Sequence, residues 1–154
     1  MTVKKTRILF LCAGNSCRSQ MAEGWARFLK SDQIEPYSAG IEKHDLNPLA
    51  VKAMAEVGID ISHHESKTID NLPSLGFDYV VTVCGHAKEN CPRFPGKAEM
   101  IHVGFDDPPR LAEGAKSEEE EEAMQHYRRV RDEIRTFIVT LPDSLEQHRT
   151  RFTL

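Results

Sequence analysis

The chain has 154 residues, of which 40% are hydrophobic, and a formal net charge of -4. This length fits one domain with one core, and the charge argues against a nucleic-acid-binding protein, whose phosphate contacts need clustered Lys and Arg. No apolar run in the sequence approaches the length that spans a bilayer, so a membrane partner is not expected. The composition predicts a cytoplasmic protein that acts on a small charged solute.

The first half of the chain alternates strand and helix. A short apolar run at 8–11 predicts a strand buried on both faces, and apolar residues at helical spacing predict a helix over 19–30. A second strand is expected over 34–38. Asn47 and Pro48 are typical of the cap and first position of a second helix, which Gly58 ends.

The second half continues this alternation. Segments 77–83 and 100–103 predict two more strands, and the acidic run at 118–122, with a capping box from Ser117 and Glu120, predicts the start of a long helix that ends at Pro142. We predict one domain over 1–142 and a frayed tail over 143–154. Its fold is expected to be three-layer α/β, a four-stranded parallel sheet flanked by helices, with ligands at the carboxyl ends of the strands.

The first strand leads into a loop with the composition of an anion site. Loop amides at a helix N-terminus converge on an anion, and Arg18 can hold two of its oxygens in a bidentate fork. Such a site also stabilises a thiolate, so Cys12 is expected to be a nucleophile with the Ser19 hydroxyl donating to its sulfur. Gly14 permits a tight turn, and Asn15 tolerates left-handed backbone. The oxyanion is expected to be bound by Ala13, Gly14, Asn15, Ser16, Cys17 and Arg18.

A carboxyl group follows the fourth strand, in the pair Asp106 and Asp107 before Pro108. It could face the oxyanion as a general acid, although Asp before Pro also commonly starts a turn. The Cys–Arg loop favours the acid, with Asp106 as a structural neighbour whose role could be exchanged with that of Asp107.

The four cysteines are too few for a disulfide scaffold of this size. Cys17 is expected mainly to fill space. For Cys84 and Cys91, three interpretations compete: structural zinc, which lacks a second ligand pair even with His86; inert buried thiols; and a redox pair. The redox pair is favoured, because a strand-end position puts Cys84 on the same rim as Cys12. No metal or cofactor is expected, and His63 and His64 are predicted to be surface residues.

The loop at 12–19, followed by Gln20-Met21-Ala22-Glu23-Gly24, resembles the phosphate loop of the low-molecular-weight tyrosine phosphatase fold, specifically that of its arsenate reductase branch. Further matches occur in the family's order at 37–40, 47–48, 81–84, 90–92 and 104–108. The resemblance extends from about Thr6 to Phe137 and is specific, because its motifs are several and ordered.

The resemblance implies reduction of arsenate to arsenite in arsenic detoxification. Cys12 attacks arsenic while Arg18 and the loop amides hold the oxyanion, and Asp107 protonates the departing oxygen. Cys84 then attacks Cys12 and releases arsenite, and Cys91 takes over Cys84. Thioredoxin or a related dithiol carrier reduces the resulting pair. Phosphate or sulfate is expected to occupy the same site.

Two other functions use the same loop. A tyrosine phosphatase would use Cys12, Arg18 and Asp107 with water as the resolving group, but the aromatic residues that clamp an aryl ring in that branch are missing at 108–111. A redox sensor or anion-binding module without turnover is disfavoured, because it would leave Asp107 without a purpose.

One position departs from the family pattern. Some arsenate reductases of this family bind potassium beside the loop, with groups that correspond here to Asn15, Glu23 and Ser38 plus an aspartate, and Lys67 stands at that aspartate. A lysine repels a cation, but its ammonium could reach Glu23. We predict that Lys67 replaces potassium and braces Asn15; the alternative is a solvated surface lysine.

Overall fold

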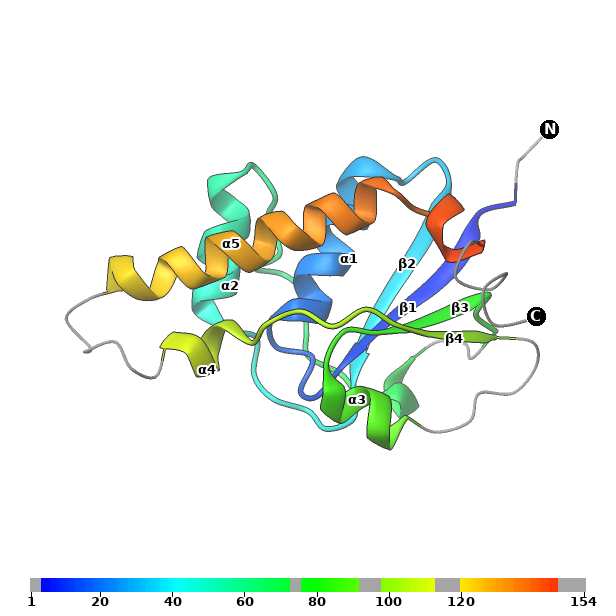
Figure 1. The fold of residues 1–154 in the computed structure, drawn as a ribbon, viewed down its shortest axis with the longest axis horizontal. Helices are drawn as coiled ribbons and strands as arrows, with labels where there is room; N and C mark the ends of the chain where they lie inside the picture. The colour runs from blue at the N-terminus through cyan, green and yellow to red at the C-terminus, as the bar shows by residue number, and fades with distance from the viewer. Residues whose placement is uncertain (1–3, 73–75, 92–97, 113–119, 147–154) are drawn as a thin grey trace.

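The computed structural model describes residues 4–72, 76–91, 98–112 and 120–146 (Figure 1). The elements in chain order are β1 (Thr6–Cys12), α1 (Arg18–Leu29), β2 (Ile34–Gly40), α2 (Pro48–Glu56), the short 3-10 helix η1 (Ile69–Asn71), β3 (Tyr79–Thr82), α3 (Gly85–Asn90), β4 (Glu99–His102), α4 (Pro108–Ala112) and α5 (Glu120–Val139).

The four strands form one parallel sheet in the order β2-β1-β3-β4. Helices α1, α2 and α5 lie on one face of the sheet and α3 on the other (Figure 1). Strand β1 therefore lies between two helical layers, and its residues Ile8 to Leu11 are fully buried. This confirms the predicted three-layer α/β fold. The parallel strands bring the ends of β1 and β3 to one rim, where Val83 N–H donates to Leu11 O at 2.9 Å.

The longer elements agree with the sequence to within one or two residues. Asn47 caps α2, because its Oδ1 accepts from the amide of Leu49 at 2.8 Å, and Gly58 follows the helix with a φ of +82°. Helices α3 and α4 and the 3-10 turn η1 are too short to produce a periodic pattern in the sequence.

The long helix α5 starts in the acidic run, as expected, with Glu120, Glu121 and Glu122 in its first turn. Ser117 of the predicted capping box lies outside the described residues. Beyond α5, residues 143–146 form a helical turn in which Leu145 is fully buried; the remainder of the expected tail, 147–154, also lies outside the described residues. Of the helices described, none has the length and apolar character needed to cross a membrane.

Candidate active site

Cys12 is the last residue of β1, and its sulfur contacts the first turn of α1. The Cys12 Sγ lies 2.8 Å from Ser19 Oγ, and Ser19 Oγ accepts a hydrogen bond from Asn15 Nδ2 at 2.9 Å. Because Asn15 occupies one lone pair of the hydroxyl, the Ser19 hydrogen is available to the sulfur. The structure thus brings together Cys12, the predicted nucleophile, and the Ser19 hydroxyl that was expected to donate to its sulfur.

The nucleophile loop, residues 12–18, turns its carbonyl groups away from its own centre. At distances of 2.9–3.1 Å, the carbonyls accept from the segment after β2, in the pairs Cys12 with Ile41, Ala13 with Glu42, Gly14 with His44 and Ser16 with Asn47. The amides of residues 13–18 donate to no described residue. Free amides at the start of a helix are the arrangement that binds anions, and the predicted oxyanion-binding residues carry these amides.

Gly40, at the end of β2, allows this segment to approach the loop closely. A Cβ atom at Gly40 would lie 2.4 Å from Glu42 O and 2.7 Å from Asn15 N. Both contacts are with backbone atoms, which cannot rotate away. The loop is therefore supported from behind by main chain rather than by flexible side chains.

Asn15 is fully buried and has a left-handed φ of 52°. Its Oδ1 accepts from Gln20 Nε2 at 2.9 Å and from the Lys67 amide at 3.0 Å. Its main-chain oxygen accepts from Ser66 Oγ at 2.8 Å. The conformation is therefore held by several buried bonds, which offset the cost of the left-handed backbone. The sequence suggested the conformation of Asn15 but not Gln20 or Ser66 as its partners.

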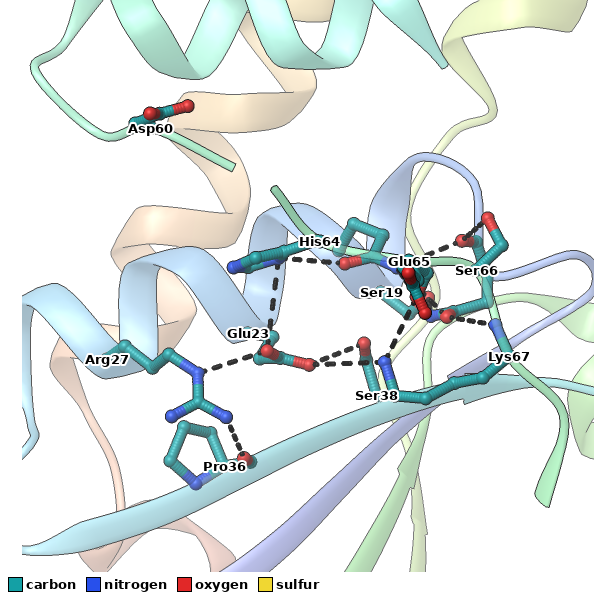
Figure 2. A network of polar contacts seen from close by, with 12 residues as sticks. Ser19, Glu23, Arg27, Pro36, Ser38, Asp60, His64, Glu65, Ser66 and Lys67 are labelled. Atoms are coloured by element: carbon teal, nitrogen blue, oxygen red, sulfur yellow. Dashed lines mark hydrogen bonds and ion pairs between the residues drawn. The ribbon is translucent and has the colours of Figure 1, made fainter. Parts of the chain in front are cut away.

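Glu23 is the centre of the polar network beside the loop (Figure 2). Only 5% of it is exposed; its Oε1 accepts from Ser38 Oγ at 2.7 Å, and its Oε2 accepts from Arg27 Nε at 3.0 Å. Lys67 Nζ lies 4.0 Å from Glu23 Oε1, so it reaches this carboxylate. The contact of Lys67 with Asn15 is made by its main-chain amide rather than by its ammonium.

His64 is not the surface residue that the sequence suggested. Its side chain is 9% exposed, and its Nδ1 lies 3.0 Å from Gln20 Oε1 and 3.9 Å from Glu23 Oε2. Burial lowers the pKa of His64, although the Glu23 charge opposes this. No local sequence pattern indicates this contact, because it joins residues 44 positions apart. The neighbouring His63 is exposed, as expected.

The structure separates the two candidate acids. Asp107 immediately precedes α4, and its Oδ1 lies 3.5 Å from Arg18 Nη2. Arg18 Nη1 donates to Phe105 O at 2.8 Å. Asp106 instead accepts from Arg129 Nη2 of α5 at 3.0 Å. Asp107 is therefore the carboxyl group that faces the nucleophile loop, and Asp106 ties the same segment to α5.

Cys84 and Cys91 lie at the two ends of α3. Cys84 is buried at its N-cap, where its Sγ accepts from the Ala87 amide at 3.4 Å, and Cys91 follows the last turn, half-buried. Because Leu11 pairs with Thr82, Cys12 and Cys84 leave neighbouring strands at the same rim. Seven helical steps separate the Cα atoms of Cys84 and Cys91 by about 10 Å, beyond the roughly 7 Å limit of a disulfide. No disulfide joins any of the four cysteines, all of which the structure describes.

Cys17 is 4% exposed, and burial raises the pKa of its thiol, with the charge of Cys12 adding to the effect. The Cys17 thiol therefore stays protonated beside Cys12. Burial also raises the pKa of Cys91. Within the described ranges, no group of three or more His, Cys, Asp or Glu side chains is arranged to hold a metal ion.

Comparisons with known proteins agree with this geometry. The family described as low molecular weight phosphotyrosine protein phosphatase matches residues 7–151. An arsenate reductase of Halalkalibacterium halodurans is 52% identical over 142 residues, which cover 92% of this chain and 99% of that protein. An arsenate reductase of Bacillus subtilis is 56% identical over 127 residues, or 82% of this chain and 88% of that protein. Among solved structures, an arsenate reductase in the phosphate binding state has a TM-score of 0.70 and 30% identity, covering 88% of this chain and 95% of that chain.

Proposed function

We propose that this chain, which belongs to the low molecular weight phosphotyrosine protein phosphatase family, reduces arsenate to arsenite with Cys12 as the nucleophile. The observation that carries the proposal is that Cys12 and Cys84 leave neighbouring strands at one rim, with Cys91 at the other end of α3, in a chain about half identical to proteins named arsenate reductase. A phosphatase needs only one thiol. The enzyme would work in the cytoplasm, where thiols are kept reduced.

In the first step, the loop amides and the Arg18 guanidinium bind arsenate, and the Cys12 thiolate attacks arsenic. Ser19 stabilises the thiolate beforehand by donating to its sulfur. Asp107 gives its proton to the departing oxygen, which leaves as water. The position of Asp107 beside Arg18 supports this role, since the guanidinium then contacts both the oxyanion and the acid.

In the second step, the Cys84 thiolate attacks Cys12 Sγ. A Cys12–Cys84 disulfide forms, the sulfur–arsenic bond breaks, and its electron pair stays on arsenic, which leaves as arsenite. Cys91 then attacks Cys84, which frees the Cys12 thiolate. The Cα separation across α3 requires this helix to open before Cys84 and Cys91 can join. A dithiol carrier of the thioredoxin type would return both to thiols and supply the two electrons.

An assay with arsenate, thioredoxin, thioredoxin reductase and NADPH tests the proposal. We expect NADPH oxidation that depends on both arsenate and this protein, with stoichiometric arsenite. The runner-up, hydrolysis of phosphate monoesters, is favoured only by the family description and the shared Cys12, Arg18 and Asp107 geometry. Aryl phosphate hydrolysis without arsenate-dependent NADPH oxidation would establish the phosphatase instead.

We further propose that Lys67 supplies, beside Glu23, the positive charge that potassium supplies in some relatives. The 4.0 Å distance between Lys67 Nζ and Glu23 Oε1 supports this, as does the almost complete burial of the carboxylate. A buried carboxylate needs a compensating charge, and Arg27 and Lys67 provide two. Asn15, Glu23, Ser38 and Lys67 would then brace the loop without a bound cation.

A further inference from the structure

We infer that His64, acting through the side-chain amide of Gln20, is a positioning residue that fixes Asn15 and so aims the oxyanion-binding amides of the nucleophile loop. The inference rests on the proposed function only in that the loop binds an oxyanion. It assigns roles to two side chains that neither the reaction steps nor the charge balance of Glu23 requires.

The orientation of the Gln20 amide is determined by its neighbours. Gln20 is fully buried, and its Nε2 faces three oxygens: Asn15 Oδ1 at 2.9 Å, Asn15 O at 3.2 Å and Glu65 O at 3.2 Å. A rotated amide would bring its own oxygen against these three acceptors. The nitrogen must therefore face Asn15, and Oε1 must face the opposite side.

On that opposite side, His64 Nδ1 lies 3.0 Å from Gln20 Oε1. An amide oxygen only accepts, so Nδ1 must carry a hydrogen. Neutral His64 is therefore the Nδ1–H tautomer, and the second proton of the charged ring goes to Nε2. The brace survives in both charge states. The ionisable groups whose charges act on the ring are Glu23, His63, Arg27 and Lys67.

The contact matters because Asn15 is the strained residue of the loop, with its φ of 52°. Without a donor at position 64, Gln20 Oε1 would be buried and unpaired, and rotation of the amide would relieve this at the expense of both bonds to Asn15. The amides on either side of Asn15 would then lose their common direction, and the oxyanion would lose donors.

Two substitutions of similar size separate this role from filling space. His64→Leu removes the donor, whereas His64→Asn puts an amide N–H where Nδ1 was. We expect His64→Leu to weaken binding of inorganic phosphate, measured by calorimetry, about five- to tenfold. His64→Asn should stay within about twofold of the wild type. His63→Leu is the matched control. The His63 ring is exposed, and its centroid lies 4.7 Å from that of the His64 ring in an edge-to-face arrangement. Its replacement should not change the phosphate affinity.

Equal phosphate affinity in the wild type and His64→Leu would overturn the inference, as would an equal loss in His64→Leu and His64→Asn. A wild-type protein that binds neither phosphate nor arsenate would instead overturn the proposed function. These two failures are therefore distinguishable in one set of titrations.

A second measurement needs no variant. Nitrogen-15 NMR of the wild-type protein, with His64 assigned through bonds, should show a protonated Nδ1 and a bare Nε2 at neutral pH. The Nε2–H tautomer would overturn the inference even if every variant failed to fold. A residue that only fills space would show no fixed tautomer.

Discussion

The two sides of Cys12 are built differently. On one side, the bracing segment 64–67 joins α1 and the loop through buried polar groups. These groups are Asn15, Ser19, Gln20, Glu23, Ser38 and Ser66. On the other side, the relay helix α3 has only Ala87 buried among its residues Gly85–Asn90. We call the first the stiff side and the second the soft side. We expect binding of the tetrahedral oxyanion to depend on the stiff side and thiol exchange to depend on the soft side.

The physical causes of this contrast are visible in the contacts. A helix of six residues is far below the length that is stable alone, and α3 is capped by a thiol at 3.4 Å, a weak acceptor. Such a helix can open at low free-energy cost. The loop, in contrast, would lose several buried hydrogen bonds if it moved. The comparison predicts that substitutions on the soft side change exchange rates, whereas those on the stiff side change oxyanion affinity.

The largest effect is expected at the junction of the two sides. Cys12→Ser should abolish arsenate reduction and any phosphatase side activity, by at least about 10⁴-fold, because both need the same thiolate. Phosphate binding, measured by calorimetry, should persist, since the amides and Arg18 are unchanged. Substantial turnover by this variant would contradict the central role of Cys12.

Substitutions of the relay cysteines should stop turnover at different stages. Cys91→Ser should release one arsenite per enzyme and accumulate a Cys12–Cys84 disulfide, whereas Cys84→Ser should release none. Mass spectrometry after one turnover identifies the disulfide. A Cys12–Cys17 disulfide in Cys91→Ser would mean that Cys17 is the resolving thiol. Phosphate affinity should match the wild type in both variants, because both changes lie on the soft side.

Asp107→Asn should slow the first chemical step by about 10²-fold, because the amide cannot donate the proton that the leaving oxygen needs. Phosphate affinity should change little, since the acid acts on the leaving group. Asp106→Asn is the matched control: its ion pair with Arg129 is exposed, so its loss should alter the rate less than about twofold. An equal or larger effect at Asp106 would move the acid to that residue.

A more stable α3 should slow the exchange, and a less stable α3 should not slow it. A Cβ at Gly85 meets no atom within 4 Å, so Gly85→Ala should stabilise the helix and slow Cys84–Cys91 exchange about two- to threefold. Glu89→Gly, at an exposed position in the same helix, should speed the exchange or leave it unchanged. Quenched-flow alkylation follows the step directly. Slower exchange in both variants would show that α3 need not open.

The smallest expected effect is that of the cation. Replacing potassium by sodium at constant ionic strength should leave the arsenate KM of the wild type unchanged, because Lys67 already lies beside Glu23. Lys67→Asp should make KM respond to potassium. The main-chain amide that braces Asn15 is retained in that variant, so a large loss of activity is not expected. A strong potassium effect on the unmutated enzyme would refute the replacement.

Sequence patterns predicted where the candidate residues of both sides lie along the chain, but they did not indicate the contacts that build the stiff side. Cys12, Arg18 and the strand ends follow from local patterns, because a strand, a loop and a helix start are consecutive in the chain. The contacts of Gln20 with His64 and of Asn15 with Ser66 join residues more than 40 positions apart. Hydrophobic periodicity contains no information about such pairs, so His64 was wrongly assigned to the surface.

The resemblance favours Asp107 over Asp106 as the acid, but local sequence patterns alone do not separate the two residues. The two residues are adjacent and chemically identical, so only the partners of each, Arg129 for one and Arg18 for the other, distinguish them. The long helix α5 was predictable from its apolar stripe, but the position of Arg129 relative to the acid depends on how that helix docks.

Gly40 should be among the positions least tolerant of replacement in this chain, because no space is left there for a side chain. A methyl group there would meet Glu42 O at 2.4 Å and Asn15 N at 2.7 Å, and both atoms belong to main chain that is hydrogen-bonded on its other side. In a saturation screen for growth on arsenate, substitutions at Gly40 should therefore be depleted as strongly as those at Cys12. A residue without a reactive side chain would thus rank with the predicted nucleophile.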